Sequence, residues 1–446
     1  MVDRELVEKV FNCIDQERLV NTTRDLVRIP SEPVRELEKM RYLEGRLREA
    51  GVEVIVQQGE GLVWNRPNVI GILRGRAKGK CVLLHSHTDT LPPVPVQKAP
   101  YCAEVKDERI YGLGTSDMIG GLAASIETLQ AIKDSGIDLR GTVIFAAVCG
   151  ERHGTGSSYL VKSGLLTGDL KPDFAIITEP SAMEIGLAHG GCIEMVIETF
   201  GRPGHPADIT GTFTRRAPPV NAVLKMVEII NELNRMLKEE AYFQYRHELV
   251  GPPRFYIGAI EGGSVMDSEG SSRRWPSGPM IETGFGNKFM ESCIRESVNA
   301  SITPEFCRVR IGMRTPPGKG YGTAPSISTE EFVDMVKKRI AKLQKEDPTL
   351  EAKVTLYWDQ NLPSVTSPEE PEVKLLQEAL EYVRGRKPLM TGFNYIIDQP
   401  YLTRAGIPTV NCGPVAGRQL SAEEYITFQE LIEATKVYIY AVLAKD

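Results

Sequence analysis

Residues 81–89 of the chain read CVLLHSHTD, an apolar run that ends in alternating histidine and aspartate. Two further apolar runs, TVIFAAV at 142–148 and FAIIT at 174–178, also have the composition of buried strands. Between the first two lies GGLAASIETLQAIKDSG at 120–136, where leucine and isoleucine recur at helical spacing. Strands that alternate with helices predict an α/β fold with a mostly parallel sheet and helices on both faces.

The pattern changes after Glu179. From about residue 189 the chain reads strand 192–200, helix 221–237, strand 254–260, strand 307–314, helix 329–344 and strand 353–358. This βαββαβ order is that of the ferredoxin-like unit. We therefore expect a main domain in two parts, residues 1–188 and 359–446, with a ferredoxin-like lid inserted at 189–358. The loop from 261 to 288 lacks periodicity and is expected to be disordered or to cover a ligand.

Composition narrows the range of partners. A length of 446 residues favours two domains, and a formal net charge of -6 argues against binding to nucleic acid or to an anionic membrane. The first 19 residues predict an amphipathic charged helix rather than a signal peptide, so we expect a cytoplasmic protein. The eight cysteines contain no CxxC pair and indicate neither a thiolate zinc site nor a disulfide framework. A small molecule is the expected partner.

Polar residues follow three of the predicted elements at positions suited to a ligand. His87 and Asp89 end the first strand at period-two spacing, which points both side chains the same way. Asp117 lies between glycine-rich turns before a helix, and Glu179 ends another strand. Each has an ordinary alternative: a polar strand end, an N-capping aspartate or a loop carboxylate. Carboxylates that converge would repel one another unless a cation sat among them.

Several motifs together resemble those of the M20 metallopeptidase family. In chain order they are HSHTDTLP, YGLGTSDMIGG, CGERHG, IITEPS, FGRPGHPAD with APPVNAV, NASITPEFCRVRIGMRTPPG and IIDQPYLTRAGIPTVNCGP. The resemblance covers nearly the whole chain and includes the inserted lid. It implies a metal-dependent hydrolase of a C–N bond in a small carboxylate-bearing substrate. The simplest reading is an amidase, deacylase or peptidase.

The resemblance also assigns roles around the metal. It implies that His87 binds the first metal, that Asp117 bridges two metals, and that Glu179 completes the first site. Asp89 would orient His87. Glu151 would be the general base that takes a proton from water.

Other roles implied by the resemblance lie on the lid and near the C-terminus. His205 matches a histidine that reaches the active site of a neighbouring subunit, which implies a homodimer or a higher homo-oligomer. Asn299 and Arg314 match lid residues that bind the substrate, and the guanidinium fork of Arg314 suits a carboxylate. Asp398 matches a carboxylate near the active site whose role is open.

The chain departs from the family at the second metal. Members usually have two adjacent glutamates after the third strand, but an ungapped alignment puts Glu151 on the base and Arg152 on the ligand. A guanidinium has no lone pair to donate. The remaining ligand, a histidine near the C-terminus, corresponds to Gln419 or Leu420, and no histidine follows His247. We therefore expect one divalent metal ion per chain, zinc or manganese, with Arg152 supplying positive charge or binding the substrate.

Alternatives remain open at this stage. A shifted register would make Glu151 a metal ligand and put Gly150 on the base. His153 is either a replacement ligand or a loop histidine in water. The protein could instead be a hydrolytic deaminase of an aminoaromatic acid, as in a rare aminohydrolase of the family. A non-catalytic binding protein on the same scaffold is the alternative from another class.

Overall fold

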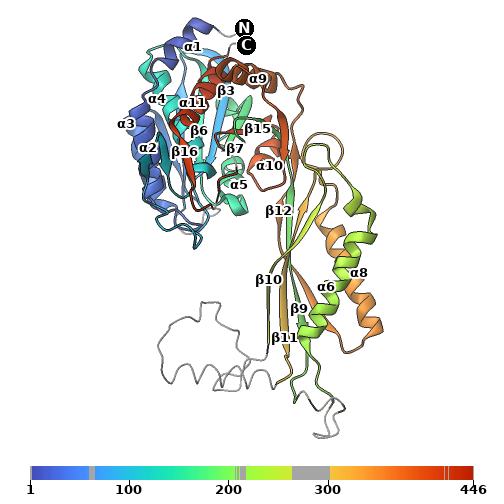
Figure 1. Cartoon of the computed structure of the whole chain (residues 1–446). Helices are drawn as coiled ribbons and strands as arrows, with labels where there is room; N and C mark the ends of the chain where they lie inside the picture. Colours follow the sequence, from blue (N-terminus) through green and yellow to red (C-terminus); the bar gives the residue numbers. More distant parts are fainter. Residues whose placement is uncertain are drawn as a thin grey trace, which may run out of the picture.

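The computed structural model describes residues 3–59, 66–205, 207, 210, 217–263, 302–415, 417–419 and 421–444. A larger α/β part contains both ends of the described chain, and a smaller, elongated part extends from it (Figure 1). Among the described residues, no helix is both long and apolar enough to span a membrane.

The larger part is built on one nine-stranded sheet. Its order is β1-β2-β6-β3-β7-β15-β8-β13, with β14 also paired to β8. The contiguous strands β6, β3, β7 and β15 run parallel, whereas antiparallel pairs lie on either side of them. The bounds are β1 Glu53–Gln57, β2 Asn68–Arg74, β3 Ala77–His87, β6 Arg140–Val148, β7 Phe174–Pro180, β8 Ile185–His189, β13 Ser364–Val365, β14 Met390–Phe393 and β15 Thr409–Gly413. The parallel core confirms the predicted fold class and brings the carboxyl ends of β3, β6 and β7 to one edge.

Helices cover both faces of this sheet, as the pattern predicted. One apolar core includes Leu43, Leu129 and Val437, and a separate core on the sheet includes Leu160 and Leu402. The helices are α1 Arg4–Phe11, α2 Gln16–Arg28, α3 Leu37–Glu49, α4 Gly120–Asp134, α5 Thr155–Lys162, α9 Pro371–Arg384, α10 Gln399–Arg404 and α11 Phe428–Leu443. Short turns of helix are η1 Thr115–Ile119, η2 Glu151–His153, η3 Gly168–Leu170 and η4 Ala241–Gln244. A small sheet joins β16 Tyr425–Thr427, β5 Arg109–Tyr111 and β4 Glu104–Lys106.

The prediction of a single N-terminal helix over the first 19 residues was wrong, because the helix is interrupted after Phe11. Helix α1 ends there and α2 begins at Gln16. The Asp15 carboxylate accepts the backbone N–H of Arg18 at 3.0 Å, so Asp15 caps a new helix instead of continuing the old one.

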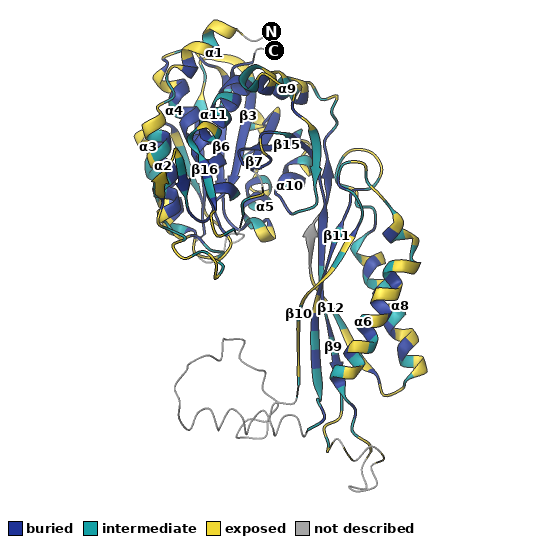
Figure 2. Cartoon of the chain, in the orientation of Figure 1, coloured by how far each residue is buried: buried dark blue, intermediate teal, exposed yellow. Residues whose placement is uncertain are grey.

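The smaller part is an antiparallel sheet of order β10-β11-β9-β12, the ferredoxin-like arrangement predicted for the lid. Its elements are β9 Gly191–Phe200, α6 Ala222–Glu239, β10 Arg254–Gly263, β11 Phe306–Thr315, α8 Thr329–Glu346 and β12 Glu351–Asn361. Helices α6 and α8 cover one face, and β10 is exposed along most of its length at the sheet edge (Figure 2). We propose 189–358 as the lid; β8 and β13 pair in the large sheet and β9 and β12 in the small one, and β12 continues past this range to Asn361.

The loop expected at 261–288 begins later than predicted. Residues 261–263 belong to β10, where they pair with β11. The rest of the expected loop lies outside the described residues.

Candidate metal centre and active site

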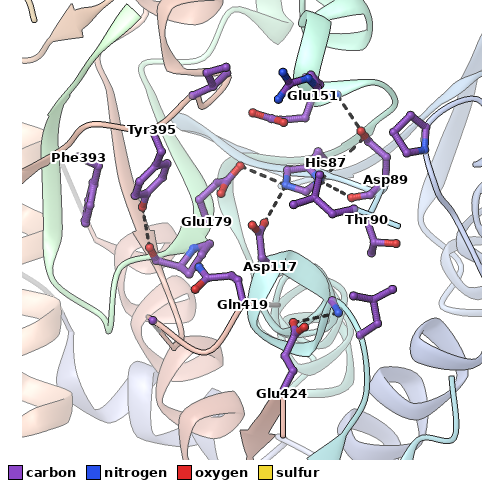
Figure 3. A pocket seen from close by; sticks show the side chains of 18 of the residues that line it. His87, Asp89, Thr90, Asp117, Glu151, Glu179, Phe393, Tyr395, Gln419 and Glu424 are labelled. Atoms are coloured by element: carbon purple, nitrogen blue, oxygen red, sulfur yellow. Dashed lines mark hydrogen bonds and ion pairs between the residues drawn. The ribbon is translucent and has the colours of Figure 1, made fainter. Parts of the chain in front are cut away.

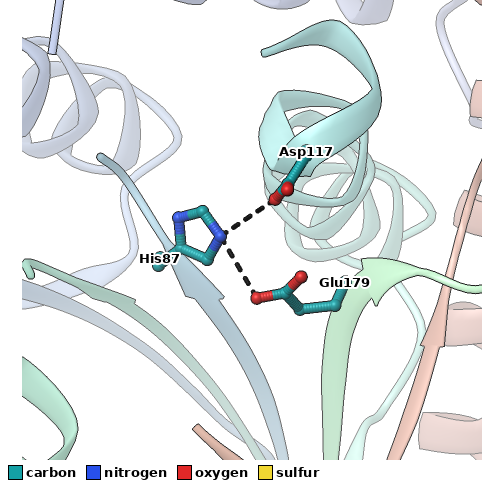
Figure 4. Close-up of side chains that lie close together, drawn as sticks. All are labelled: His87, Asp117 and Glu179. Atoms are coloured by element: carbon teal, nitrogen blue, oxygen red, sulfur yellow. Dashed lines mark hydrogen bonds and ion pairs between the residues drawn. The ribbon is translucent and has the colours of Figure 1, made fainter. Parts of the chain in front are cut away.

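Three side chains from separate elements converge at the carboxyl edge of the parallel strands (Figure 4). His87 ends β3, Asp117 lies in η1, and Glu179 lies near the end of β7. The His87 Nε2 atom is 3.1 Å from Asp117 Oδ1 and 3.2 Å from Glu179 Oε1. One ligand atom from each residue lies within 4.8 Å of the other two, which is the geometry of a candidate metal site. Asp117 makes no side-chain cap for α4, so the N-cap alternative is not what the structure contains.

The orientation of His87 is fixed by its other ring nitrogen. The His87 Nδ1–H donates to the backbone carbonyl oxygen of Asp89 at 2.8 Å, which leaves the Nε2 lone pair directed at the two carboxylates. We expected the Asp89 carboxylate to orient the ring. Its Oδ1 is 4.0 Å from Nδ1 and instead accepts the backbone N–H of Glu151 at 3.1 Å. The same residue therefore holds both His87 and Glu151, through different oxygens.

The electrostatics of this group suit a divalent cation. Burial, followed by the charge of Asp117, raises the pKa of Glu179 to about 7. Burial lowers the pKa of His87, but the charges of Glu179 and Asp117 outweigh it and raise that pKa well above its usual range. Burial and the charge of Asp117 thus favour the neutral form of Glu179, whereas the two carboxylates favour the charged form of His87. An imidazole with two carboxylates is a donor set that zinc and manganese both accept.

Glu151 follows β6 and lines the same cavity (Figure 3). Gly150, just before it, has φ 65° in the left-handed region that glycine adopts without steric cost, so the chain turns sharply there. Burial, followed by the charge of Glu179, raises the pKa of Glu151 well above its usual range. A carboxylate with a raised pKa is better suited to accept a proton near neutral pH.

The cavity around these groups has a volume of about 540 Å³. Polar and charged side chains line it together with apolar and aromatic ones. Among the lining residues are Pro33, His87, Asp89, Leu91, Leu113, Asp117, Glu151, Arg152, Glu179, Pro180, Arg314, Phe393, Tyr395, Ile396, Gln419 and Glu424. Both the larger part and the lid contribute, since Arg314 belongs to β11.

In this sequence, other residue types replace the ligands of the second metal. Arg152 and Gln419 both line it, whereas Leu420 lies outside the described residues. The Arg152 Nη2 donates to Glu194 Oε1 of β9 at 2.8 Å. In the described part of the chain, His87, Asp117 and Glu179 form the one His, Cys, Asp or Glu group able to hold a metal ion.

The residues expected on the lid near the substrate differ in where the structure places them. The Arg314 side chain lines the cavity, and its buried Nη1 has no hydrogen-bond partner among the residues that the structure describes. Asn299 lies outside the described residues. His205 is exposed on the lid, where its Nδ1 accepts the backbone N–H of Ala207 at 3.2 Å, and it does not line the cavity of its own chain.

Neither His153 nor Asp398 is among the residues that line the cavity. His153 is exposed and does not join the metal-binding group. Asp398 is buried just before α10, with Oδ2 3.9 Å from His85 Nε2. Burial raises the pKa of Asp398 to about 7 and lowers that of His85 to about 3. His85 also bonds through Nε2 to the Ser157 hydroxyl at 2.7 Å.

Reasoning from the sequence missed Glu424, which holds the segment that carries Asp117. Its Oε1 accepts the backbone N–H of Gly114 at 2.9 Å and the Ser116 hydroxyl at 2.9 Å. It is buried and lines the cavity. The one signal in the sequence was its position, a few residues after Gln419. Its partner Gly114 lies 310 positions away, so no local pattern connects the two residues.

Sequence reasoning also missed an aromatic wall formed by Phe393 and Tyr395. Their ring centroids are 4.9 Å apart, and both line the cavity. The Tyr395 hydroxyl donates to the Pro180 carbonyl oxygen at 2.8 Å, which fixes this ring beside Glu179. The segment FNYII has no helical or strand periodicity that would have marked it.

Comparison with known proteins shows the family of this chain. Residues 83–444 match peptidase family M20/M25/M40, and the chain belongs to that family. Acetylornithine deacetylase of Salmonella arizonae is 30% identical over 228 residues, which are 50% of this chain and 56% of that protein. Acetylornithine deacetylase of Buchnera aphidicola is 24% identical over 360 residues, 79% of this chain and 77% of that protein. The chain thus spans little more than half the length of the first of these relatives.

Solved structures show the same fold at low sequence identity. Human carnosine dipeptidase 1 matches with a TM-score of 0.73 and 17% identity, covering 98% of this chain and 98% of that chain. An M20 family metallo-carboxypeptidase from Sulfolobus solfataricus matches with a TM-score of 0.68 and 18% identity, covering 95% of this chain and 99% of that chain.

Proposed function

We propose that this protein is a metal-dependent hydrolase that cleaves a C–N bond in a small carboxylate-bearing substrate. The observation that carries the proposal is the convergence of His87, Asp117 and Glu179 in a cavity that Glu151 also lines. Family membership supports the reaction type. The simplest substrate is an amide, so the enzyme is an amidase, deacylase or peptidase.

We propose that one metal ion, zinc or manganese, binds at His87, Asp117 and Glu179. Support comes from the two neighbouring positions, Arg152 and Gln419, which offer a cation and an amide rather than a carboxylate and an imidazole. Arg152 is paired with Glu194 of the lid, which offsets part of its positive charge beside the cavity.

The chain's own residues would divide the work as follows. A divalent cation supplies Lewis acidity that makes water easier to deprotonate near neutral pH. Glu151 accepts the proton from the attacking water and returns it to the leaving nitrogen. Asp89 positions both His87 and the backbone of Glu151. Arg314 binds the substrate carboxylate, and its unpaired buried Nη1 supports that role.

A second candidate is hydrolytic deamination of an aminoaromatic acid. The Phe393–Tyr395 wall beside Glu179 supports it, since a flat ring can stack on such a surface while Arg314 binds the carboxylate. Attack would then take place on a ring carbon, with ammonia as the leaving group.

One assay separates the two candidates. The metal-loaded protein is incubated with a panel of N-acyl amino acids, dipeptides and aminoaromatic acids, and released ammonia and released carboxylic acid are both measured. Amide cleavage predicts carboxylic acid or a free amino acid without ammonia, and deamination predicts ammonia alone. Turnover by neither route from a protein that binds metal would contradict the proposal and favour a binding protein.

We propose that the active unit is a homodimer. The exposed β10 edge, with Tyr256, Ile257 and Ile260 accessible, supports a contact between lids. His205 would then reach the site of the other subunit, since it does not line its own. Sedimentation equilibrium tests the dimer, and His205→Ala should lower kcat without changing the association state.

A further inference from the structure

The loop at 149–156, which joins β6 to α5, carries Glu151 and closes on itself. The Gly156 N–H donates to the Cys149 carbonyl oxygen at 2.9 Å, and the Gly154 N–H donates to the Glu151 carbonyl oxygen at 2.8 Å. Gly150 and Gly154 both have positive φ, so the loop makes two sharp reversals. Such a loop needs support from outside itself to hold one conformation.

Asn68, the first residue of β2, supplies that support from the adjacent strand. Its Oδ1 accepts the Cys149 N–H at 3.2 Å, and its Nδ2 donates to the Gly156 carbonyl oxygen at 2.9 Å. One carboxamide therefore ties together the two ends of the loop. Asn68 is fully buried and is not among the residues that line the cavity, so its contribution reaches the site only through the loop.

The orientation of this carboxamide is itself fixed. The Asn68 Nδ2 also donates to Gln57 Oε1 at 2.8 Å, and Gln57 Nε2 donates to the Ser163 hydroxyl at 2.7 Å, just after α5. Both N–H donors and the carbonyl oxygen of Asn68 are thus used. The fit against the loop is close, because a Cβ added to Gly156 would lie 2.6 Å from Asn68 Oδ1.

We propose that Asn68 is a positioning residue for Glu151, an inference that rests on the proposed role of Glu151 as general base. Asn68 holds the two ends of the loop at a fixed separation, and the turn at Gly150 then sets where the Glu151 carboxylate meets the attacking water. A misplacement of about 1 Å in a catalytic group can cost on the order of 100-fold in rate. Only a carboxamide, the group of asparagine and glutamine, offers one acceptor and two N–H donors on a single planar group.

The test variant is Asn68→Asp, which keeps the size of the side chain and the acceptor for the Cys149 N–H. It removes the donor to Gly156 and sets a carboxylate against that carbonyl oxygen. We expect kcat to fall roughly 10- to 100-fold with KM changed less than about threefold and metal content unchanged. Hydrogen exchange of the 149–156 amides should accelerate.

Two further variants complete the design. Gln57→Met removes the partner that orients Asn68 but leaves both loop bonds available, so its loss of kcat should be smaller. Thr435→Val removes a buried hydrogen bond of similar length, 2.9 Å to the Leu431 carbonyl oxygen in α11, far from the loop in the fold. It should lower thermal stability without altering kcat or exchange at 149–156.

The outcomes separate this inference from the proposed function. If Asn68→Asp unfolds, the same readouts on Gln57→Met decide the question. Suppose that Glu151→Gln abolishes turnover. Unchanged hydrogen exchange at 149–156, or an unchanged kcat, in Asn68→Asp would then overturn the positioning role alone. Full turnover by Glu151→Gln would overturn the proposed base and with it this inference. A lower kcat of Asn68→Asp with little change in KM, together with faster hydrogen exchange at 149–156, would support the inference.

Discussion

The Arg152 Nη2 donates to Glu194 Oε1 at 2.8 Å, and this bond joins the loop that carries Glu151 to strand β9 of the lid. The Arg152 side chain is 44% exposed and that of Glu194 19% exposed. An ion pair this accessible stabilises by less than about 1 kcal/mol. Its importance lies in the arrangement of lid and loop, since the two residues come from different parts of the fold.

Breaking this pair should weaken substrate binding more than chemistry. We expect Glu194→Gln to raise KM by at most about fivefold, the factor that corresponds to 1 kcal/mol, with little change in kcat. Arg152→Ala should have a similar effect, and the double variant should add little to either. Steady-state kinetics of the four proteins at low and high salt measures this, and fully additive effects would contradict a direct coupling.

The metal content should depend on His87 and not on His153. We expect about one equivalent of zinc or manganese per chain by elemental analysis after dialysis, and His87→Ala should retain almost none because it removes the one nitrogen donor of the group. His153→Ala is the matched control, since this exposed histidine lies outside the group. Two equivalents in the unmodified protein would refute the one-metal proposal.

Removal of the metal should destabilise the fold by the free energy of metal binding at the prevailing metal concentration. A cation that binds only the folded state adds about 2.7 kcal/mol when its free concentration is 100 times Kd. Asp117→Asn removes a proposed ligand of the metal, so it should reduce the gain in melting temperature on adding metal. Thermal melts with chelator and with titrated metal measure both quantities. A gain on adding metal as large as that of the unmodified protein would contradict the role of Asp117 as a ligand.

The buried side chain of Lys39 should make the free energy of unfolding depend on pH. It is 1% exposed, and burial lowers its pKa to about 7, although Asp89 and Glu36 oppose that shift. Between pH 7 and about 10.5 the unfolded state therefore binds more protons than the folded state, so this group makes stability rise with pH across that window. The rise should total no more than about 5 kcal/mol.

The Lys39 prediction is measured by urea denaturation at several pH values from 6 to 10. Lys39→Met should lack this share of the rise and should be more stable than the unmodified protein near pH 6. Lys39→Arg cannot shed its proton and should be less stable throughout the range. Identical pH slopes in the unmodified protein and in Lys39→Met would show that Lys39 does not titrate in this way.

Arg314 should determine recognition of the substrate carboxylate. Arg314→Met removes a guanidinium whose Nη1 is buried and should raise KM at least about tenfold for carboxylate-bearing substrates, because a charged hydrogen-bonded pair is lost. Arg310 lies on the same strand, β11, but is exposed and does not line the cavity, so Arg310→Met should leave KM unchanged. Equal effects of the two substitutions would argue for a general electrostatic role.

Much of the fold follows from local pattern. The apolar runs at 81–87, 142–148 and 174–178 became β3, β6 and β7, and all six elements of the lid appear in the predicted order. These elements were predictable because hydrophobic periodicity reports which face of a strand or helix is buried. The N-terminal segment was not, since the break depends on a single cap at Asp15.

The sequence by itself determined which residue types the site would contain. His87, Asp117 and Glu179 stood at element ends, where parallel strands deliver side chains to one edge. The absence of a histidine after His247 and the presence of Arg152 were likewise visible in the sequence alone.

Only the tertiary structure decided how those residues are held. The Asp89 carboxylate bonds to the backbone of Glu151 rather than to His87, Glu424 holds the segment of Asp117, and Asn68 ties the loop of Glu151. Each of these bonds joins residues 62 to 310 positions apart. Hydrogen bonds have strict distance and angle limits, so the choice between competing acceptors is made by the packed strands and loops and leaves no periodic trace in the sequence.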